Sequence, residues 1–328
     1  MTQTKHKTSL LLALAIGLGP TISLAQKLVP DALQVQKLIA YCDSTKADEI
    51  LVLHAGKPVC HWKNPHCDSV YMGTASMVKS WTGLAVGCLV DRGLIKSVDD
   101  RVCQYLPEWG PGCEQDVRIR HLLTMSAGLN RRGPRGILSK SDMNAYALQL
   151  KLDTFPDVRF SYSNESAQLL GILIEKVAKK PVDKCFREWL FAPLGMDSTT
   201  LSRDSAGNLL TYGGCITTLQ DAAQIGLLML QKGQYKGRQV VSEQWIDASV
   251  TPSKLAPYYG YLWWLDNQSE HKHYAATGDL GQMTIVFPAL DLVFVRRQNC
   301  DLSSNSIAMR WMGPDFLKLV ASVVMEKP

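Results

Sequence analysis

The sequence predicts an α/β (α+β) fold in which an antiparallel sheet is flanked by helices and interrupted by an inserted, all-helical subdomain. Short β-prone runs occur near both ends of the chain, the middle of the chain reads as helical, and a closing helix follows the last run. Because the two ends would share one sheet, we expect one composite domain. Its sheet part comprises 26–97 plus 216–328, and its helical part comprises 98–215.

The β-prone runs are short and are separated by tight polar links. The first two, 50–53 and 59–62, flank Ala55-Gly56-Lys57-Pro58, which is typical of a hairpin. The later runs predict an antiparallel meander and lie at 259–265, 273–277, 283–287 and 292–297.

The helices are predicted from apolar residues at helical spacing. The longest is expected from Ser76 to Asp91, and its apolar stripe consists of Met77, Trp81, Leu84 and Cys88. The remaining helices are expected at 32–41, 119–125, 143–150, 167–178, 186–190, 222–231 and 315–325.

Residues 1–25 have the pattern of a signal peptide. A basic head at 5–7 precedes the apolar run Leu10 to Ala25, and Ser23-Leu24-Ala25 places small residues where a signal peptidase cuts. The run is short for a bilayer span, although an uncleaved anchor is the alternative. The sequence therefore predicts a protein that is exported, periplasmic or secreted, with no membrane span after cleavage.

The charge balance argues against nucleic acid or a membrane surface as a partner. The chain has 35 basic and 30 acidic residues, a formal net charge of +5. Cleavage after Ala25 would remove two basic residues and no acidic one, which leaves +3. A charge this small gives little long-range attraction to a polyanion.

Nine cysteines in an exported chain favour disulfide bonds over catalytic thiols. We expect the bridges Cys60–Cys67 and Cys103–Cys113, because each pair is close in sequence and lies in a loop-like stretch. Cys88 falls in the helical stripe and is expected to be a buried, small apolar residue. The odd total leaves at least one thiol unpaired.

The group Cys60, His61, His66 and Cys67 could instead be read as a metal site. Its spacing fits no established zinc pattern, so a hairpin closed by a disulfide is the preferred interpretation. We expect no metal and no cofactor.

The first candidate for chemistry is Ser76 with Lys79, three residues further along the same helical face. A serine hydroxyl is a weak nucleophile at neutral pH and needs a base and a positive field, which the lysine and the helix N-terminus can supply. A Ser-x-x-Lys pairing arises by chance about once in a chain of this composition. Taken alone, a capping serine beside a surface lysine is the favoured interpretation.

The second candidate is Tyr162, with Asn164, in Phe160-Ser161-Tyr162-Ser163-Asn164. A buried tyrosine beside an ammonium has its ionised form favoured, so it could take the proton from Ser76 and later return it. The Asn164 amide could orient the substrate or the lysine. The alternative is a core tyrosine with Asn164 as a helix cap.

The third candidate is the run His273-Tyr274-Ala275-Ala276-Thr277-Gly278. Attack on a carbonyl needs two donors for the developing oxyanion, and an edge strand with small residues can approach a substrate closely. An ordinary edge strand entering a turn is the alternative.

Together these elements resemble the serine β-lactamase and penicillin-binding-protein superfamily, and most of all class C β-lactamases and their esterase, D-aminopeptidase and 6-aminohexanoate-dimer hydrolase relatives. Three elements in the same order are more specific than any one of them. The sequence similarity extends from about residue 45 to 300. It includes Arg118 to Leu129, Pro193-Leu194-Gly195-Met196, Tyr259 to Trp264 and Gly281-Gln282.

The resemblance implies a β-lactamase/transpeptidase-like fold and a catalytic role for three residues. Ser76 would be the acylated nucleophile, Lys79 would sustain its activation, and Tyr162 would be the general base and acid. Asn164 would be a substrate-binding amide.

The third family motif, Lys-Thr-Gly or His-x-Gly, can be aligned in two registers. One places it at His273-Tyr274-Ala275, with the Ala276 N–H as second oxyanion donor, and the other at Ala276-Thr277-Gly278. In either register the sequence departs from the family pattern, which counts against β-lactam hydrolysis.

The sequence therefore predicts a serine hydrolase that cleaves a small-molecule ester or amide through an acyl-enzyme. The alternatives are a class C-like β-lactamase or a D-alanyl-D-alanine carboxypeptidase on the same machinery, and a non-catalytic binding protein that keeps the fold. The substrate depends on the pocket, which we expect to be shaped by the helical middle and by loops near Tyr258 and Trp263.

Overall fold

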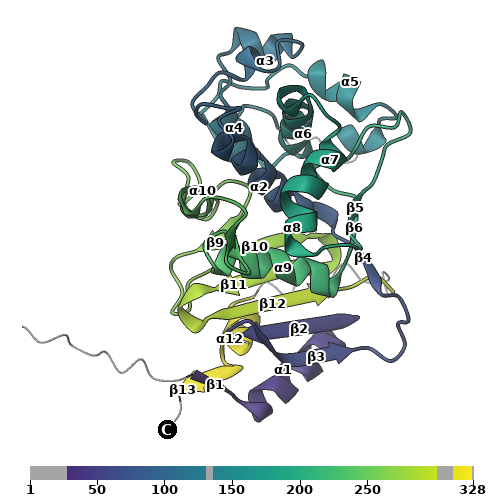
Figure 1. Cartoon of the computed structure of the whole chain (residues 1–328), viewed down its shortest axis with the longest axis vertical. Helices are drawn as coiled ribbons and strands as arrows, with labels where there is room; N and C mark the ends of the chain where they lie inside the picture. Colours follow the sequence, from purple (N-terminus) through teal and green to yellow (C-terminus); the bar gives the residue numbers. More distant parts are fainter. Residues whose placement is uncertain (1–27, 131–135, 301–312, 327–328) are drawn as a thin grey trace, which may run out of the picture.

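The computed structural model describes residues 28–130, 136–300 and 313–326. Its main sheet has six antiparallel strands in the order β3-β2-β12-β11-β10-β9 (Figure 1). The strands are β2 (Glu49–His54), β3 (Lys57–Lys63), β9 (Trp264–Asp266), β10 (His273–Gly278), β11 (Gln282–Phe287) and β12 (Leu292–Arg297). Because β2 pairs with β12, the two ends of the chain share one sheet. The predicted fold class is confirmed.

Helices cover both faces of this sheet. They are α1 (Ala32–Ser44) and α12 (Pro314–Ala321) on one face, and α2 (Val78–Asp91) and α9 (Leu219–Leu230) on the other. The strands alternate accordingly: Val52 and Phe294 pack toward α1 and α12, whereas Leu53 and Val293 pack toward α2 and α9. Both central strands are therefore buried on two sides, which explains their continuous apolar runs.

The helical part lies at the opposite end of the molecule from α1 and α12 (Figure 1). Its elements are η2 (Val102–Gln104), α3 (Gly110–Glu114), α4 (Ile119–Leu123), η4 (Ile137–Ser139), α5 (Met143–Leu148), α6 (Asn164–Ala178), α7 (Val182–Phe186), η5 (Arg187–Phe191) and α8 (Ala192–Leu194). All fall within 98–215, although the subdomain boundaries themselves stay a prediction.

Shorter elements complete the chain. A second sheet, in the order β4-β6-β5, joins the segment before α2 to the segment before α9. The remaining elements are β1 (Leu28–Pro30), β4 (Tyr71–Gly73), η1 (Ala75–Met77), β5 (Thr200–Leu201), β6 (Cys215–Thr218), β7 (Gln234–Tyr235), β8 (Arg238–Gln239), α10 (Glu243–Ser249), η6 (Asp279–Gly281), η7 (Pro288–Leu290) and β13 (Val324–Glu326).

The strand predicted at 259–265 is wrong over most of its length, since only its last two residues belong to β9. Gly260 packs against the Ser249 carbonyl, where a Cβ would lie 2.1 Å from the oxygen. Leu262 has a φ of 62°, which a strand does not accommodate. The segment is therefore a loop, despite its β-prone composition.

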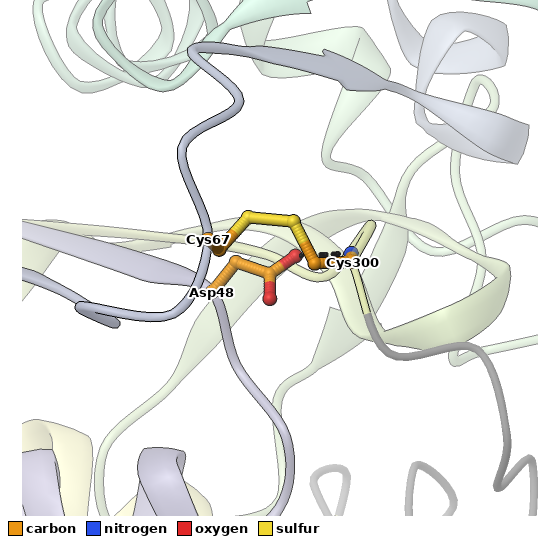
Figure 2. A group of neighbouring side chains, drawn as sticks. All are labelled: Asp48, Cys67 and Cys300. Carbon is orange, nitrogen blue, oxygen red and sulfur yellow. Dashed lines mark hydrogen bonds between the residues drawn. A yellow bond between two sulfur atoms is a disulfide. The ribbon is translucent and has the colours of Figure 1, made fainter.

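One of the two predicted disulfides is confirmed and the other is wrong. Cys103 and Cys113 are bonded, whereas Cys67 is bonded to Cys300 and not to Cys60 (Figure 2). Cys60 lies inside β3 with its thiol in the core beneath α1 and α12, so it is not available to the loop that holds Cys67. Cys88 is fully buried with a free thiol, as predicted.

Two residues of the alternative metal site, His61 and Cys67, have other partners. His61 contacts Glu49 at 2.6 Å, and the Cys67 sulfur is in the disulfide. Asp48 lies beside that disulfide and accepts the N–H of Cys300 at 2.9 Å (Figure 2). Because a sulfur in a disulfide is not a thiolate ligand, the group Asp48, Cys67 and Cys300 is a poor metal site.

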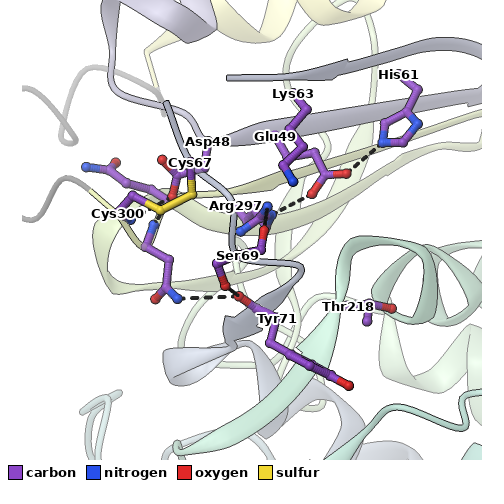
Figure 3. A network of polar contacts seen from close by, with 12 residues as sticks. Asp48, Glu49, His61, Lys63, Cys67, Ser69, Tyr71, Thr218, Arg297 and Cys300 are labelled. Atoms are coloured by element: carbon purple, nitrogen blue, oxygen red, sulfur yellow. Dashed lines mark hydrogen bonds and ion pairs between the residues drawn. A yellow bond between two sulfur atoms is a disulfide. The ribbon is translucent and has the colours of Figure 1, made fainter. Parts of the chain in front are cut away.

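A buried ion pair holds the segment that leads into β4 (Figure 3). The Arg297 side chain is fully buried, and its Nε lies 2.6 Å from the Glu49 carboxylate. The same guanidinium donates to the Ser69 carbonyl, and Cys67 of the same segment is tied to the end of β12. The approach to β4, and so to residue 76, is therefore fixed by two connections.

The predicted signal segment, 1–25, lies outside the described residues. Among the residues that the structure does describe, no helix is both long and apolar enough to cross a membrane.

Candidate active site

Ser76 stands on a tight turn between β4 and α2. Ala75 has a φ of 45°, a left-handed conformation that is costly for a residue with a Cβ. The turn is held by the Thr74 N–H, which donates to the Cys215 carbonyl on β6 at 2.8 Å. Ser76 is half-buried, whereas nearly all of the helix that follows is fully buried. The turn therefore presents the hydroxyl at the N-terminus of a buried helix.

Lys79 lies under Ser76 with 1% of its surface exposed. Its Nζ donates to the Ser76 Oγ at 2.9 Å and to the Tyr212 carbonyl at 2.6 Å. It also lies 5.0 Å from the centre of the Tyr162 ring and 5.6 Å from that of Tyr212. Two acceptors and two aromatic faces are the contacts that a buried ammonium needs.

Tyr162 comes from the segment that enters α6. Ser163 caps this helix by accepting the Ser166 N–H at 3.2 Å, so Asn164 is its first residue rather than its cap. The Tyr162 ring stacks on Trp264, with 5.5 Å between the ring centres, and meets Tyr259 edge-on. The structure thus brings Ser76, Lys79 and Tyr162 into one cluster.

The end of β10 lies directly against the Ser76 turn. At Gly278 a Cβ would come within 2.4 Å of the Thr74 carbonyl oxygen and 2.9 Å of the Ser76 nitrogen. Only glycine fits there. This contact favours the register Ala276-Thr277-Gly278 for the third motif.

The other alignment of the third motif uses His273 and the Ala276 N–H. His273 begins β10, five residues before Gly278, and its ring packs on Phe287 with 4.9 Å between centres. Burial lowers the pKa of His273, so the ring is neutral at pH 7. The Ala276 side chain is fully buried in the core beneath α2 and α9. The His273 side chain therefore lies at the end of β10 that is remote from Gly278, and the role of the Ala276 N–H as an oxyanion donor stays a prediction.

Several contacts at this site carry no signal in the sequence. The Tyr212 carbonyl is a backbone group 133 residues from Lys79, so its residue type gives no hint of its role. The pair Gly213-Gly214, just before β6, does predict a tight turn and was the available clue. Trp264 was expected only as part of a strand, and its stacking on Tyr162 depends on the loop geometry.

The sequence model of the beta-lactamase family matches residues 42–309. The chain belongs to the beta-lactamase family. The match spans the sheet, the helical part and the Ser76 cluster, so the recognised resemblance is confirmed.

Two curated relatives and one solved structure show the range of the family. The chain is 28% identical to a Beta-lactamase of Yersinia enterocolitica over 46% of this chain and 37% of that protein. It is 24% identical to the 6-aminohexanoate-dimer hydrolase of Paenarthrobacter ureafaciens over 67% of this chain and 64% of that protein. The octameric penicillin-binding protein homologue of Pyrococcus abyssi has the same fold, with a TM-score of 0.68 and 21% identity over 85% of this chain and 76% of that one.

These matches cover less than two thirds of both curated relatives. They fix the family and the fold, and they leave the substrate to the chain's own residues.

Proposed function

We propose that this protein is an exported serine hydrolase that cleaves a small-molecule ester or amide through an acyl-enzyme on Ser76. The observation that carries the proposal is the 2.9 Å contact between the Lys79 Nζ and the Ser76 Oγ, beside the Tyr162 ring. The hydrolases among its relatives, such as the 6-aminohexanoate-dimer hydrolase, support the reaction class. Export rests on the signal-peptide pattern, and the two disulfides agree with it.

In the acylation step the Ser76 Oγ attacks the carbonyl carbon of the substrate. Tyr162 accepts the hydroxyl proton while the Lys79 ammonium favours the ionised phenol. The backbone N–H of Ser76, and one from the Gly278 end of β10, would bind the oxyanion. Tyr162 then protonates the leaving alcohol or amine as its bond to the carbonyl carbon breaks, which leaves Ser76 acylated.

Deacylation repeats the steps with water as the nucleophile. Tyr162 takes a proton from water, the hydroxide adds to the ester carbonyl, and the proton returns to the Ser76 Oγ as the acid product leaves. We assign to Asn164, at the first position of α6, the role of a substrate-binding amide.

A β-lactamase or D-alanyl-D-alanine carboxypeptidase activity is less favoured. In the register that Gly278 indicates, Ala276 stands where the family motif has a cation. A cation at that position would bind the carboxylate of a β-lactam or a peptide terminus. The protein should therefore turn over nitrophenyl esters faster than a chromogenic cephalosporin.

The test is covalent labelling by a fluorophosphonate, followed by mass spectrometry of the intact protein. One adduct is expected, on Ser76, and the Ser76→Ala protein should have neither adduct nor turnover. Ser44→Ala, which alters an exposed serine on α1, should label like the natural protein. Turnover retained by Ser76→Ala would refute the proposal.

A further inference from the structure

A cavity of about 420 Å³ opens beside the Ser76 cluster, between the loop before β9 and the strands β9 and β10. We call it the β9–β10 cavity. Its size is that of a small-ligand site. None of the sequence motifs accounts for it, so its contents are a separate question from the chemistry at Ser76.

The cavity borders the catalytic cluster at Trp264. Thr277, which lines the cavity, immediately precedes Gly278, although neighbouring residues of a strand point to opposite faces of the sheet. Trp264, which also lines the cavity, stacks on Tyr162. A substrate held at Ser76 could therefore extend one of its chains into the cavity.

The cavity then follows β10 away from Ser76. Thr277, Ala275 and His273 are alternate residues of one strand face, and all three line it. Four residues of extended strand span about 13 Å. A fully extended chain covers that distance in roughly ten bonds, if it advances as an extended peptide does.

The walls are mainly apolar and aromatic. Trp264 and Tyr258 face each other in parallel planes, with 6.4 Å between ring centres and 11° between the rings. Leu265, Ile285 and Leu317 add aliphatic surface. These walls suit methylene groups and offer little to a charged group along the way.

The far end is different, because it contains a carboxylate. Of the described residues that line the cavity, Asp266 alone has a formal charge. It pairs with His273 in the sheet register, so it lies at the end remote from Gly278. Burial raises the pKa of Asp266, but the N–H groups of Ser269 and Gln268, the Ser269 side chain and the nearby His273 outweigh it and hold this pKa below its ordinary value. The carboxylate is therefore ionised at pH 7.

The neighbouring His273 does not neutralise this charge. Its Nδ1 lies 3.0 Å from the His271 carbonyl oxygen and 4.0 Å from the Asp266 Oδ2, so the carbonyl is its nearer partner. The buried ring is neutral, as described above. Asp266 Oδ1 accepts two backbone N–H groups at 2.9 Å, and Oδ2 is the oxygen nearer to the imidazole.

We propose that the β9–β10 cavity binds an apolar chain of roughly ten bonds that ends in an ammonium group beside Asp266. Resting on the proposed function, this makes the substrate an ester or amide with a terminal amine on one side of the scissile bond. The amine pairs with the Asp266 carboxylate, and the methylenes pack on Trp264 and Tyr258.

Two matched pairs of esters test the preference, one for each side of the scissile bond. The first pair is the nitrophenyl esters of aminooctanoic and nonanoic acid, and the second is the acetate esters of aminooctanol and nonanol. In one pair the ammonium substrate should have a kcat/KM at least about tenfold higher, as expected for one charge-assisted contact. Asp266→Asn should abolish that preference, because its amide oxygen can still accept the turn N–H groups while the charge is gone.

Asp291→Asn is the matched control, since it removes the same charge from an exposed turn after β11 and should keep the preference. Ser76-dependent turnover with no preference in either pair would overturn the cavity proposal and leave the hydrolase intact.

A binding measurement separates the two proposals in the other direction. Calorimetry with the Ser76→Ala protein should show that octylammonium binds at least about tenfold more tightly than octanol, and that Asp266→Asn removes the difference. This result does not depend on turnover, so it would support the cavity even if every ester were left uncleaved. Equal binding of the amine and the alcohol would refute it.

Discussion

The Ser76 cluster lies at the Gly278 end of β10, the β9–β10 cavity runs along the same strand from Thr277 to His273, and the two are built in opposite ways. The cluster depends on a three-residue spacing at the start of a fully buried helix, and a glycine contact closes it. The cavity is assembled from a loop, an edge strand and α12, and part of it is open to solvent. Single-atom changes in the cluster should therefore alter the rate of the reaction, whereas changes in the cavity should alter which substrate is preferred.

The largest expected effect on activity is that of Tyr162→Phe in the Ser76 cluster. The ring stays stacked on Trp264 and beside Lys79, so only the phenol oxygen is lost. If this oxygen is the general base, kcat should fall by about 10²–10⁴ with little change in KM. Steady-state kinetics on a nitrophenyl ester measures both constants.

The matched variant is Tyr258→Phe in the cavity wall, which should change kcat less than about threefold. A near-normal rate for Tyr162→Phe would move the base role to Lys79.

Gly278→Ala is expected to have the next largest effect. The new Cβ would meet the Thr74 carbonyl oxygen at 2.4 Å, so β10 or the Ser76 turn must move. A displacement on the order of 1 Å at a reacting centre costs about a hundredfold in kcat/KM. Gly73→Ala, whose Cβ would meet no heavy atom within 4 Å, is the control. Equal activity of the two folded variants, compared by circular dichroism, would show that the contact has no catalytic importance.

The smallest expected effect is a pH dependence of stability that comes from His273, at the cavity end of β10. Burial lowers the pKa of His273 below its ordinary value of 6.5, so the unfolded chain binds this proton at a higher pH than the folded chain. The contribution of His273 should therefore lower the stability as the pH drops below 6.5, and this contribution should stop changing below the folded pKa of His273. Urea unfolding at several pH values measures the slope.

His273→Gln should make that slope shallower. Burial also lowers the pKa of His121, so part of the slope remains. An unchanged slope in His273→Gln would contradict the assignment, because the buried imidazole would then contribute nothing to the pH dependence.

The sequence predicted what depends on local pattern. Spacing alone placed Ser76 and Lys79 on one face of a helix, and the structure puts that helix close to its expected ends. The β-prone runs at both ends of the chain correctly predicted the shared sheet.

The features that the sequence missed depend on distant partners. Cys67 joins Cys300 across 233 residues, and sequence proximity pointed to Cys60 instead. The sequence allows two alignments of the third motif, and only the contact between Gly278 and Thr74, which are distant in the chain, favours one of them. The position of Asp266 beside His273 depends on the β9–β10 register, which no local pattern specifies.

The pairing of β2 with β12 determines when the molecule can assemble. During synthesis, the second strand of the sheet leaves the ribosome long before its neighbour, with the whole helical part translated in between. The Ser76 turn lacks its contact with β10 until Gly278 has emerged, and the apolar edge of β2 lacks its native partner β12 until residue 297 has emerged. A nascent chain that already carries the complete Ser-x-x-Lys helix therefore still lacks the strand against which the Ser76 turn packs.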